Sequence, residues 1–517
     1  RVVCERAAEQ RDLLAGALSG EASGEVNLQR RPPVEEVLTH AQDRGAGVAG
    51  AVEKPMDETD LSGRDMTGIV VSKFGGSSVA NATQIEKVRK IVAEDTRRRI
   101  VVVSAPGRLH PDEEKLTDHL INIATGGEHF RDQRISVNVA ESRKTVTERF
   151  TEISRELEVE DDDLLASLEE DLNTQLSGQR RIAFLASRGE HYNARIIALY
   201  FAKRGMPAAV QLPENIGLKV TNRYLDTEVT RDALSDTGKL TGGEMISVVP
   251  GYYGVTEGGE VAVFSRGGSD LTGSVIAKAV DADCYENWTD VSGVFEVDPR
   301  VIEDARIIPR LTFKEMRLLS SKGFNVFHLN AMKPCWERKI PIHIRNTNRP
   351  SDPGTIILSE RVPEEGVVGI AQLNNVAYIN LEKYQLGEEI GFTAKLLTIF
   401  QDFNIQSYHY PTDKDDISVV VDQTDLTGTI NDLRRRIESE LKPDFMDVVY
   451  NLSILTPVGM GLRGNSYPIV EALSALSRQH IPIKMIDQSP SQMCFHIGVS
   501  SAVADAALKI LYDQLSG

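Results

Sequence analysis

Three short segments of the sequence combine residue types that suit phosphate chemistry. The first is KFGGSS, at residues 73–78, which lies between a β-branched run and an amphipathic stretch. Paired glycines let a backbone approach a phosphate closely, the start of a helix offers free N–H donors, and Lys73 adds a point charge. Because no GxxxxGK[ST] pattern occurs in the chain, this is not a Walker A loop. Taken alone, the segment is also compatible with an ordinary glycine-rich turn.

The second segment is SRGGSD, at residues 265–270, which again places glycines and hydroxyls before a predicted helix. Here Arg266 is suited to clamp a carboxylate through two hydrogen bonds, and Asp270 is suited to orient a lysine, a substrate ammonium group or metal-bound water. The third segment, residues 288–300, is by itself typical of a strand end followed by turns. Because it follows two phosphate-type loops, we interpret it as a candidate nucleotide pocket.

Such loops need a scaffold that brings them together. From residue 69 onward, short β-branched runs alternate with longer amphipathic stretches, which is typical of an α/β fold with a mostly parallel sheet covered by helices. Loops at the carboxyl ends of such strands converge on one crevice. The first helix is predicted at 81–98, with Asn81 as N-cap and four apolar residues on one face: Ile85, Val88, Ile91 and Val92. The predicted strands are 69–72, 100–103, 181–185, 208–212, 245–250, 261–264 and 282–286, and a helical insertion is predicted at about 113–179.

After about residue 360 the sequence changes character and repeats itself. Residues 377–441 predict the order strand, helix, strand, strand, helix, and residues 452–515 predict the same order again. A repeated βαββα unit is typical of small α+β domains that cover one another's sheet faces or edges. Residues 1–65, by contrast, show little apolar periodicity. We expect them to be an N-terminal extension, either disordered or artificial.

Composition and charge narrow the classes of partner. The 517 residues are 41% hydrophobic and 26% charged, as in ordinary soluble proteins, and carry a formal net charge of −18 without a basic block. This charge argues against nucleic acid or an anionic membrane as a main partner. No apolar run approaches the ~20 residues of a membrane span, and we expect a cytoplasmic protein. Since the four cysteines form no CxxC pair, we predict buried thiols and no metal site.

The three segments, in this order, resemble those of the aspartokinase branch of the amino acid kinase superfamily, and the repeated tail resembles the paired ACT domains that follow such kinases. The resemblance implies a three-layer amino acid kinase fold at 66–360 and two ferredoxin-like ACT domains at 361–445 and 446–517, either consecutive or interleaved. It also implies phosphorylation of the L-aspartate side-chain carboxylate by ATP, giving 4-phospho-L-aspartate. This reaction is the first step towards lysine, threonine and methionine.

The resemblance assigns roles to individual residues. Lys73, Asp270 and Arg266 would be catalytic, and Arg266 would also hold a substrate carboxylate. Further substrate contacts would come from Thr117, Ser269 and Glu190, the last of these binding the amino group. The ATP site would comprise Lys73, Gly75, Gly76, Ser77, Thr289, Asp290 and Arg300. An effector site would lie at a helix start in the tail, at Gly391, Phe392, Thr393 and Ala394.

The same resemblance implies partners and shows one departure. Mg²⁺ would enter with ATP, lysine or threonine would act as the feedback effector, and the ACT domains would pair into at least a homodimer. Many family members carry a lysine followed by His-Pro where this chain reads GFNVFHL, at 323–329, with Asn325 at the lysine position. Lys322 is the substitute that the sequence offers for the missing contact to ATP.

Two alternative functions follow from the same residues. The first is another amino acid kinase, acting on glutamate, acetylglutamate, carbamate or UMP, and the second is an amino-acid sensor with a degenerate kinase domain. The SRGGSD loop together with an ACT pair argues against the first. The presence of Lys73, Glu190, Arg266 and Asp270 argues against the second. We therefore favour a monofunctional aspartokinase.

Overall fold

The structure of the chain is a computed structural model. It describes residues 68–133, 135–159, 162–235, 237–265, 267–320, 329–362, 366–488 and 490–516. The predicted N-terminal extension, with Cys4, lies outside these ranges. Within them, no helix combines the length and the apolar character that crossing a membrane requires.

A mostly parallel sheet forms the centre of the first part of the chain. Its strands are β1 (Val70–Phe74), β2 (Arg98–Val103), β3 (Ala208–Val210), β4 (Ile246–Pro250), β7 (Cys284–Thr289), β8 (Arg310–Thr312), β9 (Ile342–Asn346) and β10 (Thr355–Leu358). They lie in the order β3-β4-β2-β1-β7-β9-β10-β8, and neighbouring strands are parallel except for β9 and β10. The predicted α/β class with a mostly parallel sheet is confirmed.

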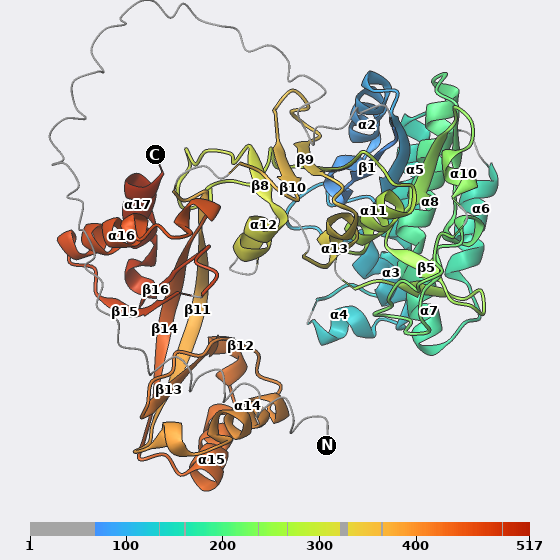
Figure 1. The fold of residues 1–517 in the computed structure, drawn as a ribbon. Coiled ribbons are helices and arrows are strands. Elements are labelled where there is room, and N and C mark those ends of the chain that lie inside the picture. The colour runs from blue at the N-terminus through green and yellow to red at the C-terminus, as the bar shows by residue number, and fades with distance from the viewer. Residues whose placement is uncertain are drawn as a thin grey trace, which may run out of the picture. The chain divides into compact units, whose positions relative to one another are not determined.

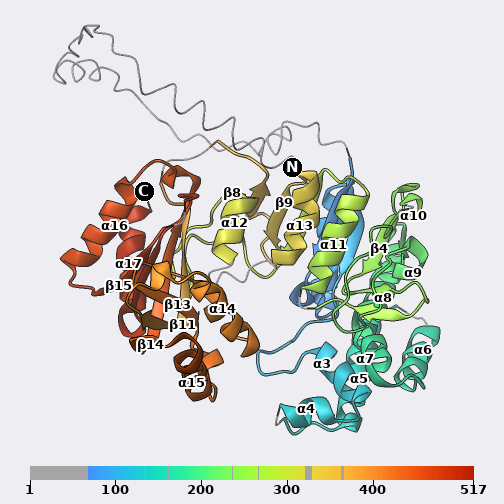
Figure 2. The ribbon, with the colours of Figure 1, turned by 60° about the horizontal axis from the view of Figure 1, so that its bottom comes forward.

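Helices cover both faces of this sheet. They are α2 (Ala82–Glu94), α3 (Leu116–Ala124), α4 (Glu128–Asp132), α5 (Val139–Glu156), α6 (Asp162–Leu172), α7 (Gly178–Ala186), α8 (Arg188–Lys203), α9 (Pro213–Ile216), α10 (Gly238–Thr241), α11 (Gly268–Ala279), α12 (Phe313–Ser320) and α13 (Leu329–Arg338). Figure 2 shows α11 and α13 across one face. Strand β2 reaches both layers, because Ile100 and Val102 join the apolar cluster of α11 and α13, whereas Val101 and Val103 join that of α2, α5 and α8.

Two predicted strands belong elsewhere. Residues 181–185 form part of helix α7, since Ala183, Leu185 and Ala186 bury a helical face there. Residues 261–263 form β6 (Val261–Val263), which pairs antiparallel with β5 (Tyr253–Val255) in a separate two-stranded sheet. The loop at 265–270 therefore follows a hairpin rather than a strand of the central sheet.

A buried ionic network joins three strands of the central sheet. The carboxylate of Glu286 accepts hydrogen bonds from Arg98 at 2.8 and 2.9 Å, from the Ser72 hydroxyl at 2.8 Å and from the Trp288 indole at 2.9 Å. Both Glu286 and Arg98 are only 5% exposed. Burial by itself would raise the pKa of Glu286, but the attraction of Arg98 outweighs it and lowers that pKa to about 2.

The second part of the chain forms one antiparallel sheet of six strands with four long helices. The strands are β11 (Gly369–Glu382), β12 (Ser407–His409), β13 (Asp416–Asp422), β14 (Phe445–Val458), β15 (Ile483–Asp487) and β16 (His496–Ser500). The helices are α14 (Phe392–Asp402), α15 (Ile430–Leu441), α16 (Tyr467–Arg478) and α17 (Ala504–Leu515). The strand order is β12-β13-β11-β14-β16-β15.

The two long strands of this sheet, β11 and β14, each serve two βαββα repeats. Residues 376–382 of β11 pair with β13 and with residues 445–452 of β14, over the core of α14 and α15. Residues 369–373 pair instead with residues 454–458, over the core of α16 and α17. Figure 1 shows β11 and β14 side by side, with one helix pair near each end. The segments of the second repeat thus flank the first repeat in the sequence, so the first repeat is inserted into the second.

Candidate active site

Lys73 lies near the carboxyl end of β1, which is a central strand of the sheet between β2 and β7. It is 7% exposed, and its Nζ lies 2.5 Å from Oδ1 of Asp270 and 3.4 Å from the amide oxygen of Asn287. Asp270 belongs to the first turn of α11, and Asn287 to β7. The structure thus brings the lysine of the first predicted loop and the aspartate of the second into direct contact.

The loop after β1 lies against the loop after β2. The Gly107 N–H donates to the carbonyl of Gly76 at 2.9 Å, and the Gly75 N–H donates to the carbonyl of Trp288 at 3.0 Å. A Cβ atom at Gly107 would lie only 2.5 Å from the carbonyl carbon of Gly76 and 2.7 Å from the nitrogen of Ser77. Only glycine permits this close approach of the two backbones. The backbone N–H groups near Ser77 are therefore suited to donate hydrogen bonds to phosphate oxygens.

Replacing Gly107 with alanine should therefore disturb the loop that the sequence predicts to bind phosphate. The methyl group would force the loop containing Gly76 away from the strand end, and a displacement of about 1 Å at a reacting centre costs on the order of 100-fold in rate. We expect that loss in kcat/KM for ATP, measured by ADP release. Gly258→Ala is the control, since its Cβ would meet no atom closer than 3.7 Å. Equal activity of the two variants would contradict the assignment of this loop.

Glu190 is a buried carboxylate next to these loops. It lies in the first turn of α8, is 5% exposed, and its Oε2 atom is buried without a hydrogen-bond partner. Burial raises its pKa to about 8, although the backbone N–H of Ala105, in the loop after β2, acts in the opposite direction. A buried acceptor of this kind is costly unless a ligand satisfies it. An ammonium group is the ligand that suits it.

The second predicted loop leads into α11. Gly267 takes a left-handed conformation, with φ 77°, as the N-cap of this helix, and Ser269 is nine-tenths buried in its first turn. A Cβ atom at Gly251, which follows β4, would lie 2.7 Å from Cβ of Ser269. The helix start therefore sits tightly against the carboxyl end of β4. This places its free N–H groups on the same side of the sheet as Lys73.

Residues of the third segment occupy the carboxyl end of β7. Thr289 is its last residue and hydrogen-bonds through its hydroxyl to Asp290 at 3.1 Å, and it directly follows Trp288, which bonds Gly75. These two residues thus lie beside the first loop. Arg300, in contrast, is exposed and its guanidinium group holds Asp298 at 2.6 Å. Among the described contacts, none joins Arg300 to the Lys73 pair.

Of three further residues that the sequence analysis singled out, the structure describes only one. Thr117 is a half-buried residue in the first turn of α3. Arg266 lies outside the described residues, and so does Asn325, within residues 321–328. The roles of Thr117 and Arg266 remain predictions.

Two residues at this edge of the sheet were missed by sequence reasoning. Asn287 contacts both Lys73 and Asp270, each at 3.4 Å. Tyr252 follows Gly251 with a positive φ of 76°, and burial together with the neighbouring charge of Glu190 raises the pKa of its phenol. A residue other than glycine in this conformation is uncommon and often marks a functional site. The signal available was position, since both residues stand at or near the carboxyl ends of predicted parallel strands.

A cavity of about 750 Å³ lies beside the second loop, between residues 226–234 and helices α11 and α13. Gly267 and Gly268 line it, but Lys73, Asp270 and Glu190 do not. The charged groups and backbone donors of the predicted nucleotide site converge at the Lys73 pair rather than in this cavity.

Comparisons with known proteins give the family of the chain. Residues 68–346 match the amino acid kinase family. Aspartokinase 3 of Bacillus subtilis is 36% identical over 452 residues, which cover 86% of this chain and 98% of the relative. The chain belongs to the aspartokinases. The crystal structure of Clostridium acetobutylicum aspartate kinase, described as an allosteric enzyme, shares 33% identity with this aspartokinase, with a TM-score of 0.77 over 86% of this chain and all of the other.

A more distant aspartokinase shares the fold. The structure of E. coli aspartokinase III in complex with aspartate and ADP is 22% identical, with a TM-score of 0.68, and covers 87% of this chain and all of the other. In the present aspartokinase, the predicted effector residues begin helix α14. Gly391 is its N-cap with φ 87°, Phe392 is buried, and Thr393 and Ala394 are exposed.

Proposed function

We propose that this aspartokinase transfers the γ-phosphoryl group of ATP to the side-chain carboxylate of L-aspartate, giving 4-phospho-L-aspartate and ADP. The observation that carries the proposal is the pairing of two features at one sheet edge. One is a glycine-lined loop with Lys73 and Asp270, which suits a polyphosphate. The other is the buried, unpartnered oxygen of Glu190, which suits an amino group. A kinase for a substrate without an amino group has no use for the second feature.

The proposed mechanism needs no general base. The attacking carboxylate is already ionised at neutral pH, so the protein has to align it with the γ-phosphorus and neutralise charge. Lys73 would balance the charge on the transferring group, while Gly75, Gly76 and Ser77 would donate backbone N–H groups to phosphate oxygens. Thr289 and Asp290 would contact the nucleoside, together with Arg300. Arg266, Ser269 and Thr117 would position aspartate.

Mg²⁺ is proposed to accompany the nucleotide. This ion prefers oxygen ligands, keeps several waters and usually takes one or two carboxylates besides the phosphates. Asp270, at the start of α11 beside the first loop, is a carboxylate that fits this requirement. When bound, the ion would supply further positive charge to the phosphates.

Replacing Glu190 with glutamine tests the substrate. Hydrogen bonds to charged groups are worth roughly 1.5–3 kcal/mol, so we expect the KM for aspartate to rise about 10- to 150-fold, with little change in the KM for ATP. The assay is aspartate-dependent ADP release, with the acyl phosphate trapped as the hydroxamate. Glu257→Gln, on an exposed residue, is the matched control. A native enzyme that forms hydroxamate from glutamate but not from aspartate would refute the proposed substrate.

The raised pKa of Glu190 adds a pH signature to the same test. Below about pH 8 the free carboxyl group is mostly protonated, and binding of the substrate ammonium must displace that proton. The native enzyme should therefore bind aspartate more weakly as the pH falls below about 8, by up to about tenfold per unit. Calorimetry in buffers of different ionisation enthalpy would detect the released proton. Glu190→Gln should lose both effects.

Regulation is proposed for the second part of the chain. We propose residues 66–360 as the catalytic domain, and residues 361–445 and 446–517 as two interleaved ACT domains. Lysine or threonine would bind where α14 begins, with its carboxylate at the N–H groups near Gly391, Phe392, Thr393 and Ala394. Pairing of these domains would join two chains in a homodimer. The reaction would be the first step towards lysine, threonine and methionine, and an end-product amino acid would inhibit it by feedback.

A further inference from the structure

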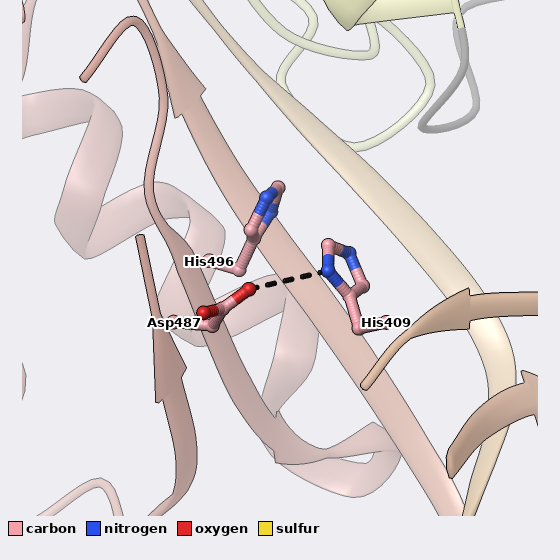
Figure 3. Close-up of side chains that lie close together, drawn as sticks. All are labelled: His409, Asp487 and His496. Atoms are coloured by element: carbon pink, nitrogen blue, oxygen red, sulfur yellow. Dashed lines mark ion pairs between the residues drawn. The ribbon is translucent and has the colours of Figure 1, made fainter. Parts of the chain in front are cut away.

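Two histidines and an aspartate meet on the six-stranded sheet, far along the sequence from the kinase loops. Figure 3 shows His409, Asp487 and His496 with their polar groups turned toward one another. They come from β12, β15 and β16 respectively. One potential ligand atom from each lies within 4.8 Å of those of the other two.

The sheet must curl to produce this meeting. In the strand order, β12 and β15 are the two outer strands. Even so, the ring centroids of His409 and His496 are 4.1 Å apart. Tyr408 and Met485, which also stand on these outer strands, pack in one apolar cluster with Val420 and Ile454. The cluster of polar groups thus connects the first βαββα repeat, through His409, with the second.

The spacing of the groups suits a tetrahedral metal. Nδ1 of His409 lies 3.3 Å from Oδ2 of Asp487. Two ligands bonded to Zn²⁺ at about 2.05 Å with a tetrahedral angle lie about 3.3 Å apart. An ion pair between His409 and Asp487 would give the same distance. Such a pair, however, does not account for the second imidazole beside it. His496 supplies that second imidazole and is 4% exposed.

The surroundings of His496 orient it as a ligand. Its Nδ1 atom lies 2.9 Å from the hydroxyl of Thr456, so a metal would be bound by Nε2. Metal-binding histidines usually hold their other ring nitrogen in such a bond. The sulfur of Cys494 lies 3.8 Å from Nε2, yet it is not a member of the group within 4.8 Å. Asp487 is half-buried and gives the group a route to solvent.

We propose that His409, Asp487 and His496 bind a divalent transition-metal ion of the Zn²⁺ class. Two imidazoles and one carboxylate favour Zn²⁺ and its neighbours over Mg²⁺ or Ca²⁺, which prefer oxygen ligands. Three protein ligands leave one coordination position open. The bound ion links the two repeats across the curled sheet, and so stabilises one arrangement of the regulatory region. The site is separate from the Mg²⁺ that would accompany ATP.

The first test is calorimetric titration of Zn²⁺ into the metal-free full chain, above the usual imidazole pKa and without nucleotide. We expect one ion per chain and no comparable binding of Mg²⁺. Changes to groups that merely support a metal ligand cost about 10- to 100-fold in affinity, so His409→Ala should cost at least about 100-fold. Asp487→Asn, on a half-buried residue, should also weaken binding and serves if the histidine variants fold poorly.

A matched control separates this site from adventitious histidines. His480 lies in the same region, is exposed and has φ 55°, which asparagine tolerates well. His480→Asn should bind Zn²⁺ like the native chain. Absorption of bound Co²⁺ provides a second readout, because a four-coordinate site gives visible bands that the His409→Ala and Asp487→Asn variants should lose. Native-like stoichiometry and affinity in His409→Ala and Asp487→Asn, or equal loss in His480→Asn, would overturn the proposal.

Discussion

Lys73→Met should lower kcat by about 100- to 1,000-fold while leaving the affinity for aspartate nearly unchanged. Lys73 is 7% exposed and its ammonium group lies 2.5 Å from Asp270, so this charge is already fixed at the first loop before ATP arrives. Removing one such pre-positioned charge from a transition state typically has this cost. Methionine matches the length of the lysine stem, which limits the disturbance to packing. Single-turnover ADP formation, with aspartate binding measured separately, checks the expectation.

A second variant separates the loss of charge from structural damage. Lys73→Met leaves the carboxylate of Asp270, 16% exposed in its side chain, without its cation. The double variant Lys73→Met with Asp270→Asn removes both charges and should recover most of any lost stability. Its kcat should remain low even though stability recovers, because Lys73 and Asp270 both belong to the proposed site. Recovery of activity along with stability would show instead that the lysine has a structural role.

Glu286→Gln should lower the free energy of unfolding by about 3–5 kcal/mol, because it leaves Arg98 buried opposite a neutral amide. Trp288 bonds to this carboxylate and is itself fully buried, so its fluorescence reports on the network directly. A Trp336→Phe background removes the other tryptophan, which is 57% exposed. Denaturant unfolding followed by this signal gives the measurement.

The control for the Glu286 variant is Glu228→Gln. Glu228 pairs with Arg223, but its side chain is 72% exposed, so its loss should change the unfolding free energy by less than about 1 kcal/mol. The folded-state pKa of Glu286 is lowered to about 2 from an ordinary value of 4.5. Its stabilising effect is therefore complete above about pH 4.5 and is lost as the pH falls towards 2. The difference between native and Glu286→Gln should shrink over that interval, and a constant difference would contradict it.

Elements with strong periodicity could be predicted from the sequence. Helix α2 begins after Asn81, whose side chain accepts from the backbone of Gln84 as an N-cap does, and it buries Ile85 and Val88 as expected. Residues 181–185 were wrongly predicted as a strand because a short apolar run has no period that separates a buried helix from a buried strand. In the structure, Ala183 is buried on the packed face of helix α7.

The site could be predicted only where a residue stands in a recognisable loop. Lys73 and Asp270 stand in glycine-rich segments, and the structure joins them. Asn287 stands in no such loop, and an amide near the carboxyl end of a buried strand acquires its contact with Lys73 only from the order of β1 and β7. The histidine cluster was invisible for the same reason. No local spacing relates His409 to His496, and their meeting depends on how the whole sheet curls.

The sharing of β11 and β14 by both repeats has a consequence for synthesis of the chain. Residues 369–373 leave the ribosome first, yet their partners at 454–458 are made only after the entire first repeat. Until then, this segment is an unpaired strand edge, open to pairing with another chain. The first repeat can complete its own hydrogen bonds up to residue 452 and can fold before the second repeat has been synthesised. A fragment that begins at residue 446 lacks a strand of its own sheet, so the second repeat cannot be produced as an intact unit by cutting the chain there.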